Sequence, residues 1–156
     1  MSVLIDTNVL MRIANADDPA ASTAESAVSN LRDDGESLFI VPQVLYEFWT
    51  AATKTTAANG LGMPTEEAAD HIERFRQLFA LLDDTPAVFA EWFALVRDHA
   101  VAGTNAYDAR LAAAMRAHGV DRLLTFNARD FRKFGVTIVD PGDFGGGGEP
   151  KTTDVD

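Results

Sequence analysis

Short apolar runs alternate with longer helical segments along almost the whole chain, and this order restricts the folds open to it. Four runs have the length and the residue types of buried strands. They are "SVLI" (2–5), "SLFIV" (37–41), "DRLLTF" (121–126) and "VTIVD" (136–140), with "ALLDD" (80–84) as a possible fifth. Strands separated by helices indicate an α/β domain, because parallel neighbours need crossover connections. We therefore predict a central, mainly parallel sheet.

The segments between these runs carry the signals of helices. Helical periodicity or end signals cover residues 7–16, 19–35, 42–60, 65–79, 86–103 and 104–119, and 127–135 is a short helix or turn. Pro19 and Pro42 suit first turns, and Gly119 suits a helix end. The helix over 42–60 is predicted to bury a face made of Val44, Phe48, Ala51 and Thr55. The helix over 104–119 is predicted to bury Tyr107, Leu111, Ala114 and Met115.

Length and composition favour one domain followed by a tail. The chain has 156 residues, no cysteine and a net charge of −11. Disulfides and thiolate metal sites are excluded, and we recognise neither a signal peptide nor a membrane-spanning run, so a cytoplasmic protein is expected. Residues 1–144 are predicted to form the domain and Gly-rich residues 145–156 a disordered tail. The acidic composition fits either an ordinary acidic enzyme or adaptation to high salt.

Four acidic residues lie near the predicted ends of strands or the starts of helices. Asp6 directly follows the first strand, and Glu47 lies in the second turn of the helix after the second strand. Asp108 lies near the start of a later helix, and Asp130 follows another strand. In a parallel sheet these positions meet at the edge formed by the carboxyl ends of the strands. We therefore expect the four carboxylates to gather at that edge.

Gathered carboxylates repel one another unless a cation lies between them. With no cysteine and no paired histidine spacing, the ligand set is all oxygen, which suits Mg²⁺ or Mn²⁺. Such a site can activate water and hold phosphate oxygens, so phosphodiester hydrolysis is the predicted chemistry. Each acid also has a structural explanation. Asp6 can cap a helix, Asp130 can pair with Asn127 as a reciprocal cap, the helix dipole favours Asp108, and Glu47 can be a solvated helix residue.

Four segments together resemble the PIN-domain nucleases, and most of all the VapC-type toxins of bacterial and archaeal toxin–antitoxin pairs. They are "VLIDTNVL", "VPQVLYEFW", "VAGTNAYDARLAAAM" and "LLTFNARDFRKFGVTIVDP", in the order and spacing of the family. The resemblance implies a three-layer α/β/α fold and a Mg²⁺- or Mn²⁺-dependent endoribonuclease. The metal ligands that it implies are Asp6, Glu47, Asp108 and Asp130. It further implies that Asn8 and Thr125 support the metal site or the substrate phosphate.

The resemblance also implies partners. These are an RNA substrate, a cognate antitoxin that blocks the acidic pocket, and a second copy of the chain, since the apolar helices over 42–60 and 86–103 offer faces for a homodimer. One position departs from the common pattern of the family. Many relatives have histidine before the third acid, whereas this chain has Tyr107, a change that can alter the substrate pocket but removes no carboxylate.

Several alternatives stay open at this point. A non-toxin PIN-domain nuclease that processes RNA, or an inactive RNA-binding module, would carry similar segments. A phosphatase of the haloacid dehalogenase type is disfavoured, because Asn8 occupies the place of its second aspartate. Four arginines near the acid-bearing segments either position phosphates or are solvated, namely Arg110, Arg116, Arg129 and Arg132.

Overall fold

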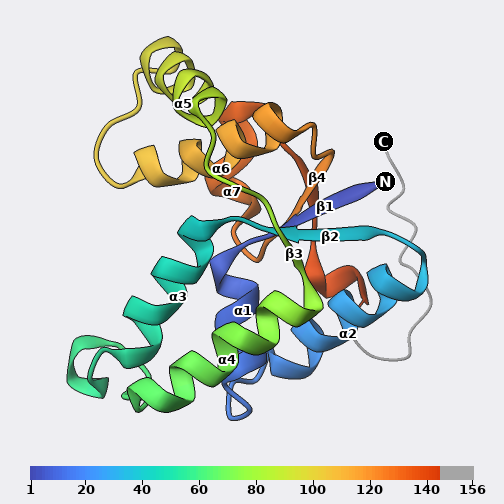
Figure 1. Cartoon of the computed structure of the whole chain (residues 1–156), viewed down its shortest axis with the longest axis vertical. Helices are drawn as coiled ribbons and strands as arrows, with labels where there is room; N and C mark the ends of the chain where they lie inside the picture. Colours follow the sequence, from blue (N-terminus) through green and yellow to red (C-terminus); the bar gives the residue numbers. More distant parts are fainter. Residues whose placement is uncertain (145–156) are drawn as a thin grey trace.

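The computed structural model of the chain describes residues 1–144, and its centre is a five-stranded parallel sheet. The strand order is β3-β2-β1-β4-β5, which places β1 in the middle (Figure 1). The strands are β1 (Ser2–Ile5), β2 (Ser37–Ile40), β3 (Ala80–Leu81), β4 (Arg122–Leu124) and β5 (Thr137–Val139). The predicted parallel sheet is confirmed, including the possible fifth strand. The tail predicted over 145–156 lies outside the described residues.

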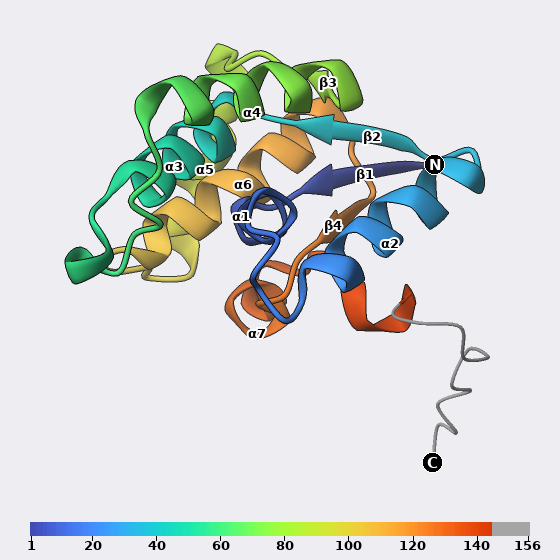
Figure 2. The same ribbon diagram turned by 90° about the horizontal axis from the view of Figure 1, so that it is seen from below.

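Helices cover both faces of this sheet, as Figures 1 and 2 show. The α-helices are α1 (Thr7–Ala14), α2 (Ala21–Asp33), α3 (Pro42–Thr53), α4 (Thr65–Leu78), α5 (Pro86–Asp98), α6 (Asn105–His118) and α7 (Ala128–Phe131). Short 3₁₀ turns follow at η1 (Thr56–Ala58), η2 (Arg132–Phe134) and η3 (Pro141–Phe144). Figure 1 shows α1, α2 and α4 on one side of the sheet and α5 and α6 on the other. The predicted three-layer α/β/α architecture is confirmed.

Some helices are shorter than the sequence predicts. Helix α3 ends at Thr53 instead of continuing to Gly60, because the backbone of Lys54 leaves the helical region. The chain then folds back on the end of α3, and a Cβ on Gly60 would lie 2.1 Å from the carbonyl oxygen of Lys54. Only glycine fits this close approach. Helix α2 likewise begins at Ala21, after a turn in which Asp18 accepts a hydrogen bond from a backbone N–H.

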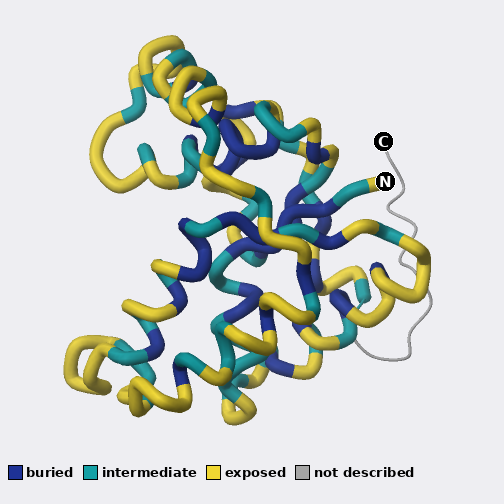
Figure 3. The backbone as a smooth tube through the Cα atoms, in the orientation of Figure 1, coloured by how far each residue is buried: buried dark blue, intermediate teal, exposed yellow. Residues whose placement is uncertain are grey.

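The core lies on both faces of the sheet. All three apolar residues of β1 after Ser2 are fully buried, and Figure 3 shows most of this central strand in the dark blue of buried residues. Phe48 of α3 and Phe75 of α4 are also fully buried, and their rings meet edge to face at 5.1 Å. Burial on both faces explains why the central strands consist of continuous apolar residues in the sequence. None of the helices within the described residues has the length and apolar character needed to cross a bilayer.

Two residues predicted to be buried are exposed. Tyr107 is 60% exposed, whereas Leu111, Ala114 and Met115 of the same predicted face are buried. Tyr107 lies in the first turn of α6, near the carboxyl ends of the strands, where less of the core covers a side chain. Thr55 is exposed because it follows the end of α3. The same edge of the sheet holds the starts of α1 and α3, which directly follow the central strands β1 and β2.

Candidate active site

Asp6 lies where β1 ends and α1 begins, and the residue is only 6% exposed. Its Oδ1 accepts a hydrogen bond of 2.7 Å from the backbone N–H of Thr7, which caps α1. Its Oδ2 accepts from the Thr125 hydroxyl at 2.7 Å and from the Asn8 amide at 3.3 Å. The structural explanation of Asp6 as a cap is therefore correct. A cap needs only one oxygen, however, and the other binds residues from two separate segments.

Asn8 and Thr125 tie the start of α1 to the end of β4. The Asn8 amide donates to the Thr125 hydroxyl oxygen at 3.1 Å, and the Asn8 side-chain oxygen accepts from the backbone N–H of Phe126 at 3.2 Å. Thr125 is 1% exposed and also accepts from the backbone N–H of Asn127 at 3.0 Å. Because β1 and β4 are paired, the two polar side chains meet directly beside Asp6. Both oxygens of Asp6 are thus held in fixed directions.

Glu47 is half-buried on α3 and is held from two sides. Its Oε2 accepts a hydrogen bond of 2.6 Å from the hydroxyl of Thr7, the residue after Asp6. Its Oε1 accepts a bond of 2.8 Å from the side-chain amide of Gln43, one helical turn earlier. Glu47 is therefore more than a solvated helix residue, since both of its carboxylate oxygens are hydrogen-bonded within the protein. Gln43 was not recognised from the sequence, although its spacing of four residues from Glu47 is a known helical hydrogen-bonding pattern.

Asp108 and Asp130 complete the group from the other side of the sheet. Asp108 is half-buried in the first turn of α6, and Asp130 is exposed in α7. Burial raises the pKa of Asp108 to about 6, and the negative charges of Asp130 and Glu47 act in the same direction. The ammonium of Lys133 opposes them. The predicted reciprocal cap between Asp130 and Asn127 does not form, since the side chain of Asn127 makes no capping bond.

The same electrostatic coupling reaches Asp6. Burial is the main cause that raises the pKa of Asp6 to about 6, while hydrogen bonds from Thr125 and Thr7 hold it down. The charges of Glu47 and Asp108 raise it further. The four predicted acids are therefore linked by electrostatic repulsion, Asp130 through Asp108, and we refer to them below as the acidic group. Four elements supply them, namely the β1–α1 junction, α3, α6 and α7.

The chemistry of this group fits a hard divalent cation. Its donors are carboxylate oxygens, with an amide and hydroxyls beside them, which are the ligand types of Mg²⁺ and Mn²⁺. The charges of Glu47 and Asp130 add to the effect of burial on the pKa of Asp108, and the ammonium of Lys133 offsets part of it. Within residues 1–144, no three His, Asp or Glu side chains are yet close enough together to hold a metal ion. Mg²⁺ in proteins usually binds through one or two carboxylates and several water molecules, so a set of three is not required.

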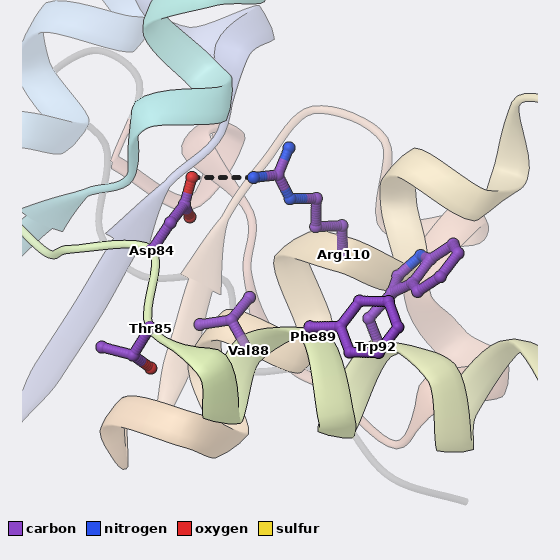
Figure 4. A pocket seen from close by; sticks show the side chains of 6 residues that line it. All are labelled: Asp84, Thr85, Val88, Phe89, Trp92 and Arg110. Carbon is purple, nitrogen blue, oxygen red and sulfur yellow. Dashed lines mark hydrogen bonds and ion pairs between the residues drawn. The ribbon is translucent and has the colours of Figure 1, made fainter.

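A separate pocket of about 290 Å³ opens between α5 and α6 (Figure 4). Its lining is mainly apolar, with Val88, Phe89 and Trp92 on α5. At its rim, Arg110 donates to Asp84 in an ion pair of 2.7 Å. Arg110, a candidate for binding phosphate, is therefore already paired with a carboxylate. None of the four grouped acids lines this pocket.

Comparisons with known proteins agree with this fold. The family model of the PIN domain matches residues 3–136. The ribonuclease VapC24 of Mycobacterium tuberculosis is 32% identical over 139 residues, which cover 86% of this chain and 92% of that protein.

Solved structures extend the agreement to the three-dimensional fold. A crystal structure of VapBC2 from Rickettsia felis, bound to a promoter DNA fragment, matches with a TM-score of 0.68 at 14% identity, over 90% of this chain and 98% of that one. A toxin–antitoxin complex from Klebsiella pneumoniae matches with a TM-score of 0.62 at 18% identity, over 89% of this chain and 97% of that one. Because the family model matches most of the chain, the chain belongs to the PIN-domain family.

Proposed function

We propose that the protein is a metal-dependent endoribonuclease and the toxin of a toxin–antitoxin pair. The observation that carries the proposal is the group formed by Asp6, Glu47, Asp108 and Asp130 at one edge of the parallel sheet, in which Asp6 and Asp108 have raised pKa values. The relative that shares 32% identity over most of both chains is a ribonuclease, which supports RNA as the substrate. The proposed nuclease domain is residues 1–144.

The four carboxylates are assigned to hold Mg²⁺ or Mn²⁺, with Asp6 and Asp108 as the principal ligands. A bound divalent cation supplies Lewis-acid chemistry, in which a water molecule and a phosphate oxygen are polarised. The side chains of Asn8 and Thr125 orient the Asp6 carboxylate through the hydrogen bonds described above. Fixed ligand directions reduce the reorganisation needed when charge develops at the phosphate. Lys133, whose charge acts on Asp108, is available to attract the RNA backbone.

Partner proteins are part of the proposal. The similar complex from Klebsiella pneumoniae contains a toxin and an antitoxin, which supports an antitoxin as a partner of this chain. A basic side chain of such a partner would complement the acidic group and block it.

We further propose a homodimer, because Phe89 and Phe93 on α5 are 65% and 50% exposed. RNA and antitoxin are both cytoplasmic, so we place the protein in the cytoplasm.

Two assays test this function. Purified wild-type protein is expected to cut RNA with Mg²⁺ or Mn²⁺ and to lose the activity in EDTA, also when tested in high salt. Expression in cells is expected to arrest growth, and co-expression of a small protein encoded directly upstream is expected to relieve the arrest. Cleavage without growth arrest would instead indicate an RNA-processing nuclease. RNA binding without cleavage would indicate an inactive binding module.

A further inference from the structure

A buried glutamine connects two of the elements that carry the grouped acids. Gln43, in the first turn of α3, is 4% exposed. Its amide nitrogen donates to Oε1 of Glu47 at 2.8 Å and to the backbone carbonyl of Tyr107 at 3.0 Å. Tyr107 directly precedes Asp108 in α6. One amide group therefore joins the Glu47 carboxylate to the turn that carries Asp108.

The orientation of this amide is determined by its neighbours. Both partners of the nitrogen are oxygens without hydrogen, so a flipped amide would place its own oxygen against two acceptors. Both N–H bonds are used, and the side-chain oxygen of Gln43 is buried without a hydrogen-bond partner among the residues that the structure describes. An apolar side chain of equal length would fill the space without a buried, unpaired acceptor of its own. The amide donates to the Glu47 carboxylate and to the Tyr107 carbonyl, and the cost of these two bonds is its buried, unpaired oxygen.

The hydrogen bonds continue beyond Glu47. The other oxygen of that carboxylate accepts from the hydroxyl of Thr7, whose backbone N–H donates to the Asp6 carboxylate. A continuous chain of hydrogen bonds thus runs from α1 through α3 to α6 and passes next to three of the four acids. Gln43 is the link between α3 and α6 in this chain.

We propose that Gln43 is a positioning residue of the acidic site: it fixes the Glu47 carboxylate relative to the first turn of α6, and so sets the spacing of Glu47 and Asp108 for binding a divalent cation. The inference rests on the proposed function, since it concerns the cation of that site. Groups that orient metal ligands without contacting the metal commonly change metal affinity by 10- to 100-fold. Loss of the Gln43 amide is expected to have an effect of this size.

Binding of Mn²⁺ alone, measured by electron paramagnetic resonance, tests the proposal. The variant Gln43→Met keeps the length of the side chain but lacks both donors, and its affinity for Mn²⁺ is expected to fall by about 10-fold or more. Gln77→Met, on the exposed side of α4, is a control that should bind as the wild type does. Val28→Ala, in the core at α2, is a second control that lowers stability and leaves the affinity unchanged.

Nuclear magnetic resonance of the wild-type chain gives a second measurement, which does not depend on whether a variant folds. The side-chain amide signals of Gln43 are expected to shift during a Mg²⁺ titration. Mn²⁺ affinity of Gln43→Met within twofold of the wild type, or amide signals that do not move, would overturn the role of Gln43. Wild-type protein that binds neither ion would contradict the proposed metal dependence as well, so the two failures can be told apart.

Discussion

Replacing Asp6 with asparagine is expected to stabilise the metal-free protein at neutral pH. The pKa of Asp6 rises from 3.8 to about 6 on folding, mainly through burial. Between these pH values the folded protein holds the proton more tightly than the unfolded chain does. The stability that this group contributes is therefore fully present below pH 3.8 and is lost as the pH rises through about 6.

The size of the effect follows from the two pKa values. A rise from 3.8 to about 6 corresponds to roughly 3 kcal/mol in the free energy of unfolding. The asparagine oxygen can still cap α1 by accepting from Thr7. The Thr125 hydroxyl oxygen already accepts from Asn8 and from the backbone N–H of Asn127, so a bond from the new amide would displace one of these, which offsets part of the gain. The amide of Asn8 loses its weaker, 3.3 Å bond. We expect a net gain of about 1–3 kcal/mol at pH 7.5, with no gain near pH 4.

Urea denaturation in EDTA, followed from pH 4 to pH 8, measures this difference. Asp70→Asn, an exposed position on α4, serves as the matched control and is expected to change stability by less than about 0.5 kcal/mol at every pH. A difference between Asp6→Asn and wild type that does not vary with pH would contradict a raised pKa of Asp6 in the folded protein. A variant less stable than wild type at pH 7.5 would contradict it as well.

Three further predictions follow from the contacts of single residues. Thr125→Val removes a hydrogen bond that lowers the pKa of Asp6, so the acid limb of the pH profile of cleavage should move to higher pH; an unmoved profile would contradict this. Lys133→Met should raise the pKa of Asp108 and reduce cleavage more at pH 6 than at pH 8; equal losses would argue against it. Phe48→Ala should lower the free energy of unfolding by about 3–5 kcal/mol in urea, and a loss below about 1 kcal/mol would show that this ring packs loosely.

The sheet could be predicted from the sequence because it depends on a simple property. Strands buried on both faces appear as short apolar runs, and helices must separate parallel neighbours. The exposure of Tyr107 could not be predicted in this way. Helical periodicity shows which residues share a face, but not where the core beneath that face ends. The end of α3 depends on the close approach of Gly60 to Lys54, a contact that no local pattern reveals.

The candidate site was only partly visible in the sequence. The positions of Asp6 and Glu47 followed from the ends of the strands, because parallel strands bring those ends together. The contacts of Gln43 were missed because a glutamine early in a helix usually points to solvent, and its bond to the Tyr107 carbonyl spans 64 positions of the chain. Asp6 shows a different limit. Its local pattern fits both a cap and a ligand; the structure shows the cap, and the contacts of its second oxygen with Thr125 and Asn8 had no signal in that pattern.

Cleavage sites mapped on total RNA, with wild-type protein and Asp6→Asn compared in Mg²⁺ and in EDTA, show whether the acidic group cuts RNA with a metal ion. We predict discrete new RNA ends with wild type in Mg²⁺, and none with the variant or in EDTA, although the variant folds. Equal cleavage by wild type and Asp6→Asn, or cleavage by wild type that EDTA leaves unchanged, would contradict a metal-dependent nuclease built on these four carboxylates.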